Sequence, residues 1–449
     1  MKNQFRDQRG TVYGFAGERI KRRKHSIILL LQMSSAVLCI TIVFLAVLLI
    51  YRNIRYSDNS NPTTPSSISQ TVPQFSQTIP VETTQAIPSF TELLPVNPIV
   101  ENYFGPLPVA ESPEPVRNFE ARGLYIGIAA AGSGADDEFA KNLSIVESSE
   151  MNAIVLNIKD EDGIRFSSEN AIARELGIVT GSYDLKKTIE AAHAKNIKVI
   201  GRVLCFKDPA FAKKNTDYCI RDQAGNILTY SSMSNKSFIN PYLTEYWEYI
   251  FSIAEEAIAF GIDEIQFDYV RFAEGKPNLG AEPYFGDPAT TPSRIDTINR
   301  FLQTARIRIQ EEHGIPITAD VFAIILSSRV EEPNIGQEWA NIGLTGISAL
   351  CPMVYPSHYD PGTTLNGATF EVPNDHPHDV VYNALIAGKS ATEQNGYAVV
   401  RPYLQATDGY QGDYNKINAQ IRAVKGAGFS EWLLWNQNAL YPEGAYDGN

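Results

Sequence analysis

Two aspartates lie in short runs whose polarity alternates from one residue to the next. Asp268 lies in EIQFDYVRF and Asp320 lies in ITADVFA. Since successive side chains of a strand point to opposite faces, Gln266 and Asp268 share one face while the apolar residues share the other. Asp320 shares a face with Thr318 in the same way. Two carboxyl groups held close together can protonate a leaving oxygen and attack or activate water, which is the chemistry of glycoside hydrolysis.

A third acid, Asp160, lies in the segment NIKDEDG, and we expect it to be a third catalytic carboxylate or an acceptor for a sugar hydroxyl. Three successive acids are also typical of a solvated loop, and their spacing lacks the ligand pattern of an EF-hand calcium loop. A structural alternative exists for the other two acids. Asp268 and Asp320 would then form ion pairs with Arg202 or Arg271 and stabilise the rim of the fold.

Polar and aromatic side chains near the ends of the other predicted strands are candidates for substrate binding. An inward-facing arginine can orient a carboxylate or lower its pKa. Aromatic faces and amides bind sugar rings by stacking and hydrogen bonding, and the following loops add Tyr359 and Tyr441. The predicted substrate-binding residues are Lys159, Arg202, Gln266, Arg271, Tyr355, Gln405, Trp435 and Asn436.

We expect no metal and no cofactor. His376 and His378 lie in HPHD, but no third ligand is found at a typical zinc spacing. The sequence contains no G-x-S-x-G motif for a nucleophilic serine and no phosphate-binding loop. The glycines of AAAGSGADD lack the spacing of a dinucleotide-binding turn, so we interpret them as an ordinary loop.

These candidate residues belong to a regular alternation of predicted strands and helices from Ala121 onward. Such alternation predicts a parallel sheet with crossover helices. Eight strands match a (β/α)8 TIM barrel with insertions in its loops, in which functional residues gather at the C-terminal ends of the strands. The alternative, a doubly wound open sheet, would show fewer strands and a glycine-rich turn after the first. The predicted strands are 122–128, 153–159, 198–206, 264–271, 317–322, 346–355, 398–405 and 431–436.

The N-terminus contains a predicted transmembrane helix. Residues 26–50 form an uncharged, mostly apolar stretch that is long enough to cross a bilayer core. The basic residues 21–24 precede it, so the positive-inside rule places residues 1–25 in the cytoplasm. A cleaved signal peptide, the alternative, would have a shorter apolar region. We expect a single-pass protein of the cell membrane, with residues 26–50 in the lipid bilayer and an extracytoplasmic catalytic domain.

The rest of the chain divides into a linker and one large domain. Residues 51–118 are rich in Pro, Ser and Thr and are predicted to be a disordered linker, whereas residues 119–449 are the predicted barrel. A formal net charge of −13 argues against nucleic acid as a partner, because such proteins need a basic surface. Cys205 and Cys219 would form a disulfide if the loop after their strand folds back. The sequence leaves that bridge and the oligomeric state open.

Six segments, taken in order, resemble a family of bacterial proteins described as glycosyl hydrolase domains of TIM-barrel type: RGLYIGIAAAGS, NAIVLNIKDEDG, KVIGRVLCFKDP, GIDEIQFDYVRF, ITADVFA and CPMVYPSHY. The resemblance spans residues 121–441. The family is similar to the α-amylase-like glycosidases, which implies Asp268 as nucleophile and Asp320 as acid/base. Such enzymes usually carry a glutamate on strand five, so the resemblance leaves Asp160 and Glu274 as alternative acids.

The anchor, the linker and the paired carboxylates together predict a membrane-anchored glycoside hydrolase that acts on a cell-wall or extracellular polysaccharide. An alternative from another class is a non-catalytic carbohydrate-binding barrel of the cell envelope. A metal-dependent, deacetylase-like hydrolase is a third hypothesis. The glycan, the linkage and the stereochemical outcome do not follow from the sequence.

Overall fold

The computed structural model describes residues 116–132, 138–230, 236–275, 279–287, 291–328, 330, 332–444 and 446–448. The predicted segments 1–25 and 26–50 lie outside these ranges, as does the predicted linker up to residue 115. Among the described residues, no helix combines the length and the apolar character that crossing a membrane requires.

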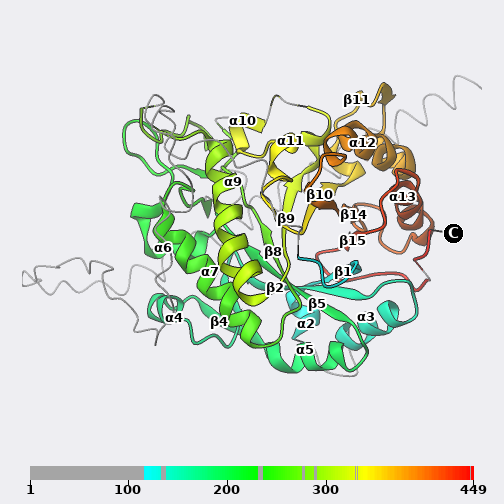
Figure 1. The fold of residues 1–449 in the computed structure, drawn as a ribbon, viewed down its shortest axis with the longest axis horizontal. Helices are drawn as coiled ribbons and strands as arrows, with labels where there is room; N and C mark the ends of the chain where they lie inside the picture. The colour runs from blue at the N-terminus through cyan, green and yellow to red at the C-terminus, as the bar shows by residue number, and fades with distance from the viewer. Residues whose placement is uncertain are drawn as a thin grey trace, which may run out of the picture. The chain divides into compact units, whose positions relative to one another are not determined.

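Eight parallel strands form a closed barrel (Figure 1). Each strand pairs with the next in the chain, and the first strand pairs with both the second and the last, which closes the ring. This arrangement confirms the predicted (β/α)8 barrel. The barrel strands are β1 (Arg122–Ile126), β2 (Ala153–Asp160), β5 (Lys198–Leu204), β8 (Glu264–Asp268), β9 (Ile317–Phe322), β10 (Ala349–Val354), β14 (Tyr403–Gln405) and β15 (Trp432–Trp435).

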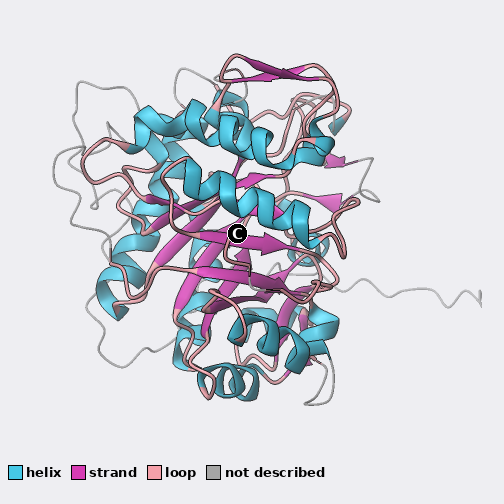
Figure 2. Cartoon of the chain, turned by 90° about the vertical axis from the view of Figure 1, so that its right-hand side faces the viewer, coloured by secondary structure: helices cyan, strands magenta, loops and turns pink. Residues whose placement is uncertain are grey.

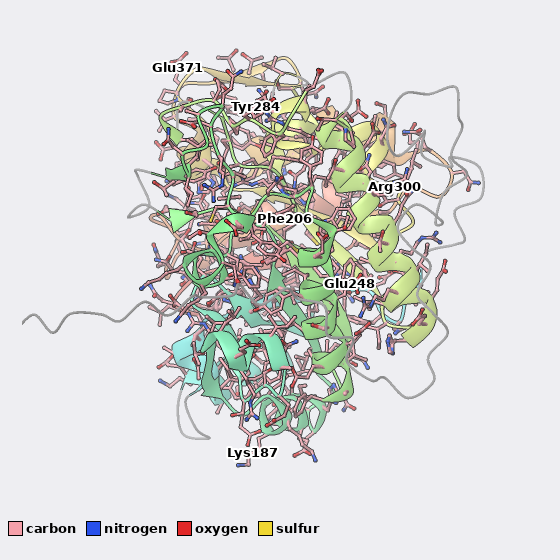
Figure 3. All side chains as sticks on the ribbon, turned by 90° about the vertical axis from the view of Figure 1, so that its left-hand side faces the viewer. Lys187, Phe206, Glu248, Tyr284, Arg300 and Glu371 are labelled. Atoms are coloured by element: carbon pink, nitrogen blue, oxygen red, sulfur yellow. The ribbon has the colours of Figure 1, made fainter. Side chains whose placement is uncertain are left out.

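Helices cover the outside of the barrel (Figure 2). Asp184 caps α5, since its carboxylate accepts a hydrogen bond from the Lys187 backbone N–H at 3.1 Å. Helices α7 and α9 lie side by side (Figure 3), where the rings of Phe251 and Phe301 stack with centroids 5.1 Å apart. The helices are α2 (Ile128–Ala131), α3 (Glu138–Glu147), α4 (Ala171–Leu176), α5 (Leu185–His193), α6 (Pro209–Lys214), α7 (Thr244–Ala259), α9 (Arg294–Ala305), α10 (Glu332–Ile335), α11 (Trp339–Ile342), α12 (Pro377–Thr392) and α13 (Tyr414–Gly426).

Short additional elements lie between the barrel strands and the main helices. A π-helical segment, η3 (Arg306–Glu311), continues α9, and β13 (Val399–Val400) precedes β14. The 3₁₀ segments are η1 (Thr216–Tyr218), η4 (Ala323–Leu326), η5 (Pro356–His358) and η6 (Pro373–Asp375). The additional strands are β3 (Gly163–Phe166) and β4 (Val179–Tyr183), which extend the sheet from β2, and the two pairs β6 (Thr229–Tyr230) with β7 (Lys236–Ser237) and β11 (Thr363–Leu365) with β12 (Ala368–Phe370).

Buried side chains form two separate apolar layers, as strand alternation requires. Val155, Ile200 and Leu433 belong to a small cluster inside the barrel. Their chain neighbours Ile154 and Val199 belong to the large cluster between the barrel and its helices. Alternate residues of each barrel strand therefore face the interior, where the polar residues of those strands also lie.

The N-terminal end of the barrel is filled by a buried chain of charges. Arg401 pairs with Glu264 at 2.6 Å and with Glu431 at 2.7 Å. Glu431 also pairs with Arg117 and accepts a hydrogen bond from the Ala121 backbone N–H at 3.0 Å. Residues just before β1 are thus attached to this end of the barrel, which we call the floor.

The cysteines within the described residues are all free and buried: Cys205, Cys219 and Cys351. The disulfide considered for Cys205 and Cys219 is therefore not formed. Each of these two thiols lies 3.7 Å from a backbone carbonyl oxygen, of Val203 and of Ala212 respectively.

Candidate active site

A pocket of about 460 Å³ opens at the C-terminal ends of the barrel strands. This is the end at which TIM-barrel enzymes hold their catalytic groups. A larger surface hollow of about 790 Å³, between α3 and residues 439–443, contains Tyr441 of the loop candidates but none of the predicted catalytic acids. Among the predicted site residues, those that line the pocket are Arg202, Asp268, Arg271, Asp320, Tyr355 and Trp435.

Asp268 is buried at the end of β8 and is held by Arg202 from β5. The Arg202 Nε–H donates to Asp268 Oδ2 at 3.0 Å, and the Nη2 group contacts the same oxygen. The backbone N–H of Tyr269 donates to the other carboxylate oxygen. Arg202 is fixed in turn by Asn157, whose Oδ1 accepts from Nη1 at 2.8 Å, and its guanidinium carbon lies 5.1 Å from the centre of the Trp435 ring. Asp268 is thus the acid of the pocket that is paired with an arginine and tightly oriented.

Asp320 lies on the next strand in a different environment. Its Oδ2 is 3.7 Å from Arg202 Nε, beyond hydrogen-bond distance. Its buried Oδ1 has no hydrogen-bond partner among the described residues. Burial and, secondarily, the negative charge of Asp268 raise the pKa of Asp320 well above its ordinary value. Burial therefore favours the protonated form of the Asp320 carboxyl group.

The two carboxyl groups lie close together because β8 and β9 pair in register. Phe267 lies opposite Ala319, so the residues that follow them, Asp268 and Asp320, are also neighbours. Arg202 Nε is 3.0 Å from Asp268 Oδ2 and 3.7 Å from Asp320 Oδ2, so these oxygens can be no further apart than the sum of the two distances. That limit argues against the longer part of the ~6.5–9.5 Å range of inverting glycosidases.

A second ion pair forms part of the pocket wall in the loop after β8. Arg271 Nη2 lies 2.8 Å from Glu274 Oε1, and the Tyr230 hydroxyl donates to the other Glu274 oxygen. The Arg271 guanidinium carbon lies 4.3 Å from the centre of the Phe322 ring and 5.1 Å from that of Tyr269. These contacts fix Arg271 at the wall and leave Glu274 partly exposed.

Aromatic rings make up much of the remaining wall. The Trp435 ring lies 4.2 Å from Tyr125 and 6.0 Å from Tyr403, measured between centroids. Tyr355 is buried, and burial raises the pKa of its hydroxyl well above the ordinary value. Tyr359 also lines the pocket, and its buried hydroxyl has no hydrogen-bond partner among the described residues.

The structure places Lys159 and Asp160 outside the pocket lining, because β2 contains an irregularity that a regular alternation does not predict. Asn157 pairs with Arg202, but Lys159 pairs with Val203, so the register shifts between them. This shift turns Lys159 to the outer face of the barrel. Asp160 then binds beside Asn157, whose Nδ2 donates to it at 3.2 Å.

Both residues have structural partners in these positions. The fully buried Lys159 ammonium lies 2.8 Å from Asp208 and 2.9 Å from the Leu204 carbonyl oxygen. Asp160 accepts a hydrogen bond from Arg165 Nε at 2.7 Å. Lys159 is therefore not available to a substrate in the pocket. Asp160 is connected to the pocket only through Asn157, which binds the lining residue Arg202.

Three predicted binding amides also lie outside the pocket lining. Gln266 is buried one layer deeper in the barrel, where it accepts a hydrogen bond from the Tyr403 hydroxyl at 2.7 Å. Gln405 accepts from the Ser357 backbone N–H at 2.9 Å and orders the loop after β10. Asn436 donates to the Ala406 carbonyl oxygen at 2.8 Å. All three position backbone or side chains that surround the pocket.

Tyr269 is the lining residue that strand alternation misplaces. The alternation puts it on the outer face with Phe267, but β8 ends at Asp268 and Tyr269 adopts a left-handed φ of 51°. A bulky residue rarely adopts this conformation, and such strain is concentrated at functional sites. No local signal predicted it. The other unpredicted lining residues are Phe322, Ala323, Ile324, Met353, His358 and Tyr403.

A family model and several solved structures match this chain. The family model described as "putative glycosyl hydrolase domain" matches residues 123–441. A hypothetical protein of known structure from Ruminiclostridium thermocellum is 32% identical over a match that covers 44% of this chain and 97% of that one, with a TM-score of 0.39. Among curated proteins, none matches this chain.

Two glycosidase structures are similar to this chain at low identity. The glycoside hydrolase domain of PgaB (BpsB) from Bordetella bronchiseptica is 12% identical, covering 71% of this chain and 95% of that one with a TM-score of 0.46. The catalytic domain of a β-amylase from Paenibacillus polymyxa is 12% identical, covering 73% and 96% with a TM-score of 0.47.

The family assignment rests on the extent of the family match. The matched residues run from Gly123 in β1 to Tyr441, after β15, and so include every barrel strand. The chain therefore belongs to the glycosidase family described as "putative glycosyl hydrolase domain".

Proposed function

We propose that the pocket hydrolyses a glycosidic bond of a polysaccharide or oligosaccharide, with Asp268 as nucleophile and Asp320 as acid/base. The observation that carries this proposal is the contrast between two adjacent carboxyl groups. Asp268 is ion-paired with Arg202, whereas Asp320 is buried with one oxygen unpartnered and its pKa is raised. Acid and base roles in glycosidases are assigned by environments that differ in this way.

The chemistry follows the retaining route. An Asp268 oxygen attacks the anomeric carbon while the leaving oxygen takes the proton of Asp320, which forms a glycosyl–enzyme ester. Water then attacks that ester as the Asp320 carboxylate removes its proton, which regenerates both acids. The hydrogen bonds from Arg202 and Tyr269 orient Asp268 without occupying all of its lone pairs. The short limit on the separation of the carboxyl oxygens supports this route over inversion.

Conservative substitutions of the two acids test the proposal. Asp268→Asn and Asp320→Asn should each lower kcat/KM on a hydrolysed oligosaccharide by about 10²–10⁴-fold, since each removes a group that acts only in the transition state. Glu371→Gln is the matched control, because Glu371 is exposed and lies outside the pocket lining. Mass spectrometry of the wild type with a slow fluorinated glycoside should find the sugar attached to Asp268. Wild-type activity in Asp268→Asn would overturn the assignment.

Glu274 is the alternative acid, because it lines the same pocket and is more exposed than Asp320. The two acids are separated by comparing substrates with good and poor leaving groups. The true acid variant should retain activity on an aryl glycoside whose leaving group needs no proton, and should lose activity on an unactivated sugar. We expect that pattern for Asp320→Asn and not for Glu274→Gln.

A non-catalytic carbohydrate-binding barrel is the second candidate function. The observation that favours it is the close pairing of Asp268 with Arg202, since a buried acid can have the purely structural role of holding an arginine in place. Both candidates predict glycan binding, so turnover separates them. Binding of a glycan panel with no hydrolysis by the wild type would favour the binding barrel.

The proposal extends to the cell envelope. Residues 26–50 would anchor the chain in the cell membrane and residues 51–118 would hold the barrel outside it, next to cell-wall or extracellular polysaccharide. The support is the apolar stretch, the preceding basic residues and the Pro-, Ser- and Thr-rich composition of the linker. In intact cells, added protease should remove the barrel and leave the N-terminus protected. Recovery of the full chain in the soluble fraction would contradict the anchor.

A further inference from the structure

The charges that line the pocket cancel in pairs. Arg202 is bonded to Asp268, and Arg271 lies 2.8 Å from Glu274. Among the described ion pairs, the cation beside Asp320 is again Arg202. The distance from Arg202 Nε to Asp320 Oδ2 is 3.7 Å, which is longer than the 3.0 Å from the same nitrogen to Asp268 Oδ2. With Asp320 protonated, these five groups carry no net charge.

The neighbouring ionisable groups do not change this balance. Lys207 lies behind Tyr269, with its ammonium 3.1 Å from the Tyr269 hydroxyl, and it is paired with Glu161. His358 lines the pocket, and burial lowers the pKa of its imidazole, which favours the neutral form. A bound molecule therefore meets no unpaired charge among the described groups at this site.

From this pairing we propose that the pocket selects an uncharged sugar, and that the Arg271–Glu274 pair determines this specificity. The inference rests on the proposed function and names its substrate class. A carboxylate or ammonium group on the sugar would lose water in the pocket without gaining a partner of opposite charge, which is costly. Uronic acids and free amino sugars are excluded for this reason, whereas neutral and N-acetylated sugars are accepted.

The groups that remain available in the pocket suit hydroxyl groups. The Tyr359 hydroxyl and Asp320 Oδ1 are buried and have no hydrogen-bond partner among the described residues. Phe322 and Trp435 supply ring surfaces at the same site. Neutral hydrogen-bonding atoms beside aromatic faces complement a pyranose, whose hydroxyls and C–H faces need both kinds of contact.

Arg271 and Glu274 set the specificity because they are the charged pair of the pocket that contains neither of the proposed catalytic acids, Asp268 and Asp320. Arg271 is buried against the Phe322 and Tyr269 rings, so its guanidinium group cannot turn outward into water. Glu274 neutralises it and is held by the Tyr230 hydroxyl. Removing either partner leaves the other charge at the pocket wall, where it would attract a sugar of opposite charge.

Matched oligosaccharides that differ only in charge test the inference on the full-length chain. The pairs are N-acetylglucosamine and glucosamine hexamers, galactan and galacturonan oligomers, and glucan and glucuronan oligomers, with binding and hydrolysis both measured. In each pair that is recognised, the neutral member should bind at least about tenfold more tightly, equivalent to ~1.4 kcal/mol. Tighter binding of a charged member would overturn the inference and leave the proposed hydrolase intact. No hydrolysis of any member would instead overturn the proposed function.

Charge variants give a sharper test, because they predict opposite shifts. Glu274→Gln should raise the affinity for the uronate oligomers by about tenfold or more relative to their neutral partners, since Arg271 loses its counter-charge. Arg271→Met should shift preference toward the glucosamine hexamer. The double variant should return to a preference for neutral sugars, and Glu371→Gln, outside the pocket, should change nothing. Unchanged preferences in both single variants would contradict the inference.

Discussion

Asp268 and Asp320 are the same residue type on adjacent strands, and their surroundings give them different chemistry. Arg202 lies within hydrogen-bond distance of Asp268 but 3.7 Å from Asp320. Burial therefore disfavours the ionised form of Asp320 relative to the protonated form, and the pKa of Asp320 rises. At the scale of single residues, the acid that we propose for catalysis has a raised pKa because one of its oxygens lacks a partner among the described residues, at a cost in stability.

That cost predicts a pH-dependent stability. The folded protein keeps the Asp320 proton at pH values where the unfolded chain has released it. The free energy of unfolding should therefore fall as pH rises from about 4, the unfolded pKa, to the raised folded pKa, by ~1.4 kcal/mol per pH unit. Asp320→Asn should lose this component in urea unfolding at a series of pH values, while Glu371→Gln should keep it. A variant with wild-type pH dependence would mean that Asp320 is ionised in the folded protein.

Among the secondary-structure elements, the register shift in β2 separates structural from functional residues. It places Lys159 opposite Val203 on the outer face, where its ammonium binds Asp208. Asp208 also caps α6 and accepts a hydrogen bond from the Tyr246 hydroxyl at 2.8 Å. One irregularity in a strand thus connects β2, α6 and α7 on the outside of the barrel.

Lys159→Met should therefore affect stability and leave substrate affinity unchanged. Leaving Asp208 as an unpaired buried charge should lower the free energy of unfolding by about 3–5 kcal/mol, whereas KM for a hydrolysed oligosaccharide should stay at the wild-type value. The double variant Lys159→Met/Asp208→Asn should recover part of the loss. Lys187→Met, which breaks a solvent-exposed pair with Asp184, is the control and should cost under about 1 kcal/mol. A raised KM in the stable double variant would restore Lys159 as a binding residue.

At the scale of the barrel, the two ends have separate tasks. The pocket occupies the C-terminal end of the strands, and the buried charges of Arg401, Glu264 and Glu431 fill the floor. The described chain enters at the floor, where Arg117 completes this group. Attachment of Arg117 to the barrel and the pocket therefore use opposite ends of the barrel and can vary independently.

Arg117→Met should accordingly lower stability without lowering activity. Glu431 would keep Arg401 and the Ala121 N–H as partners but lose one charged hydrogen bond, so the free energy of unfolding should fall by about 1–3 kcal/mol. The value of kcat/KM below the unfolding transition should equal that of the wild type. Arg174→Met, which breaks an exposed pair with Glu169, should leave both quantities nearly unchanged. A loss of activity in folded Arg117→Met would show that the floor and the pocket are coupled.

The sequence by itself determined the barrel and its two central acids. Alternation of polarity is a local property, so EIQFDYVRF and ITADVFA predicted which faces Asp268 and Asp320 occupy, and the order of the strands made them neighbours. The tertiary structure alone decided the features that depend on contacts between residues far apart in the sequence. These are the register shift that removes Lys159, the left-handed turn that brings Tyr269 into the pocket, and the depth at which Gln266 is buried. It also decided which acid Arg202 neutralises, because a difference of less than 1 Å between two oxygens on separate strands has no counterpart in residue spacing.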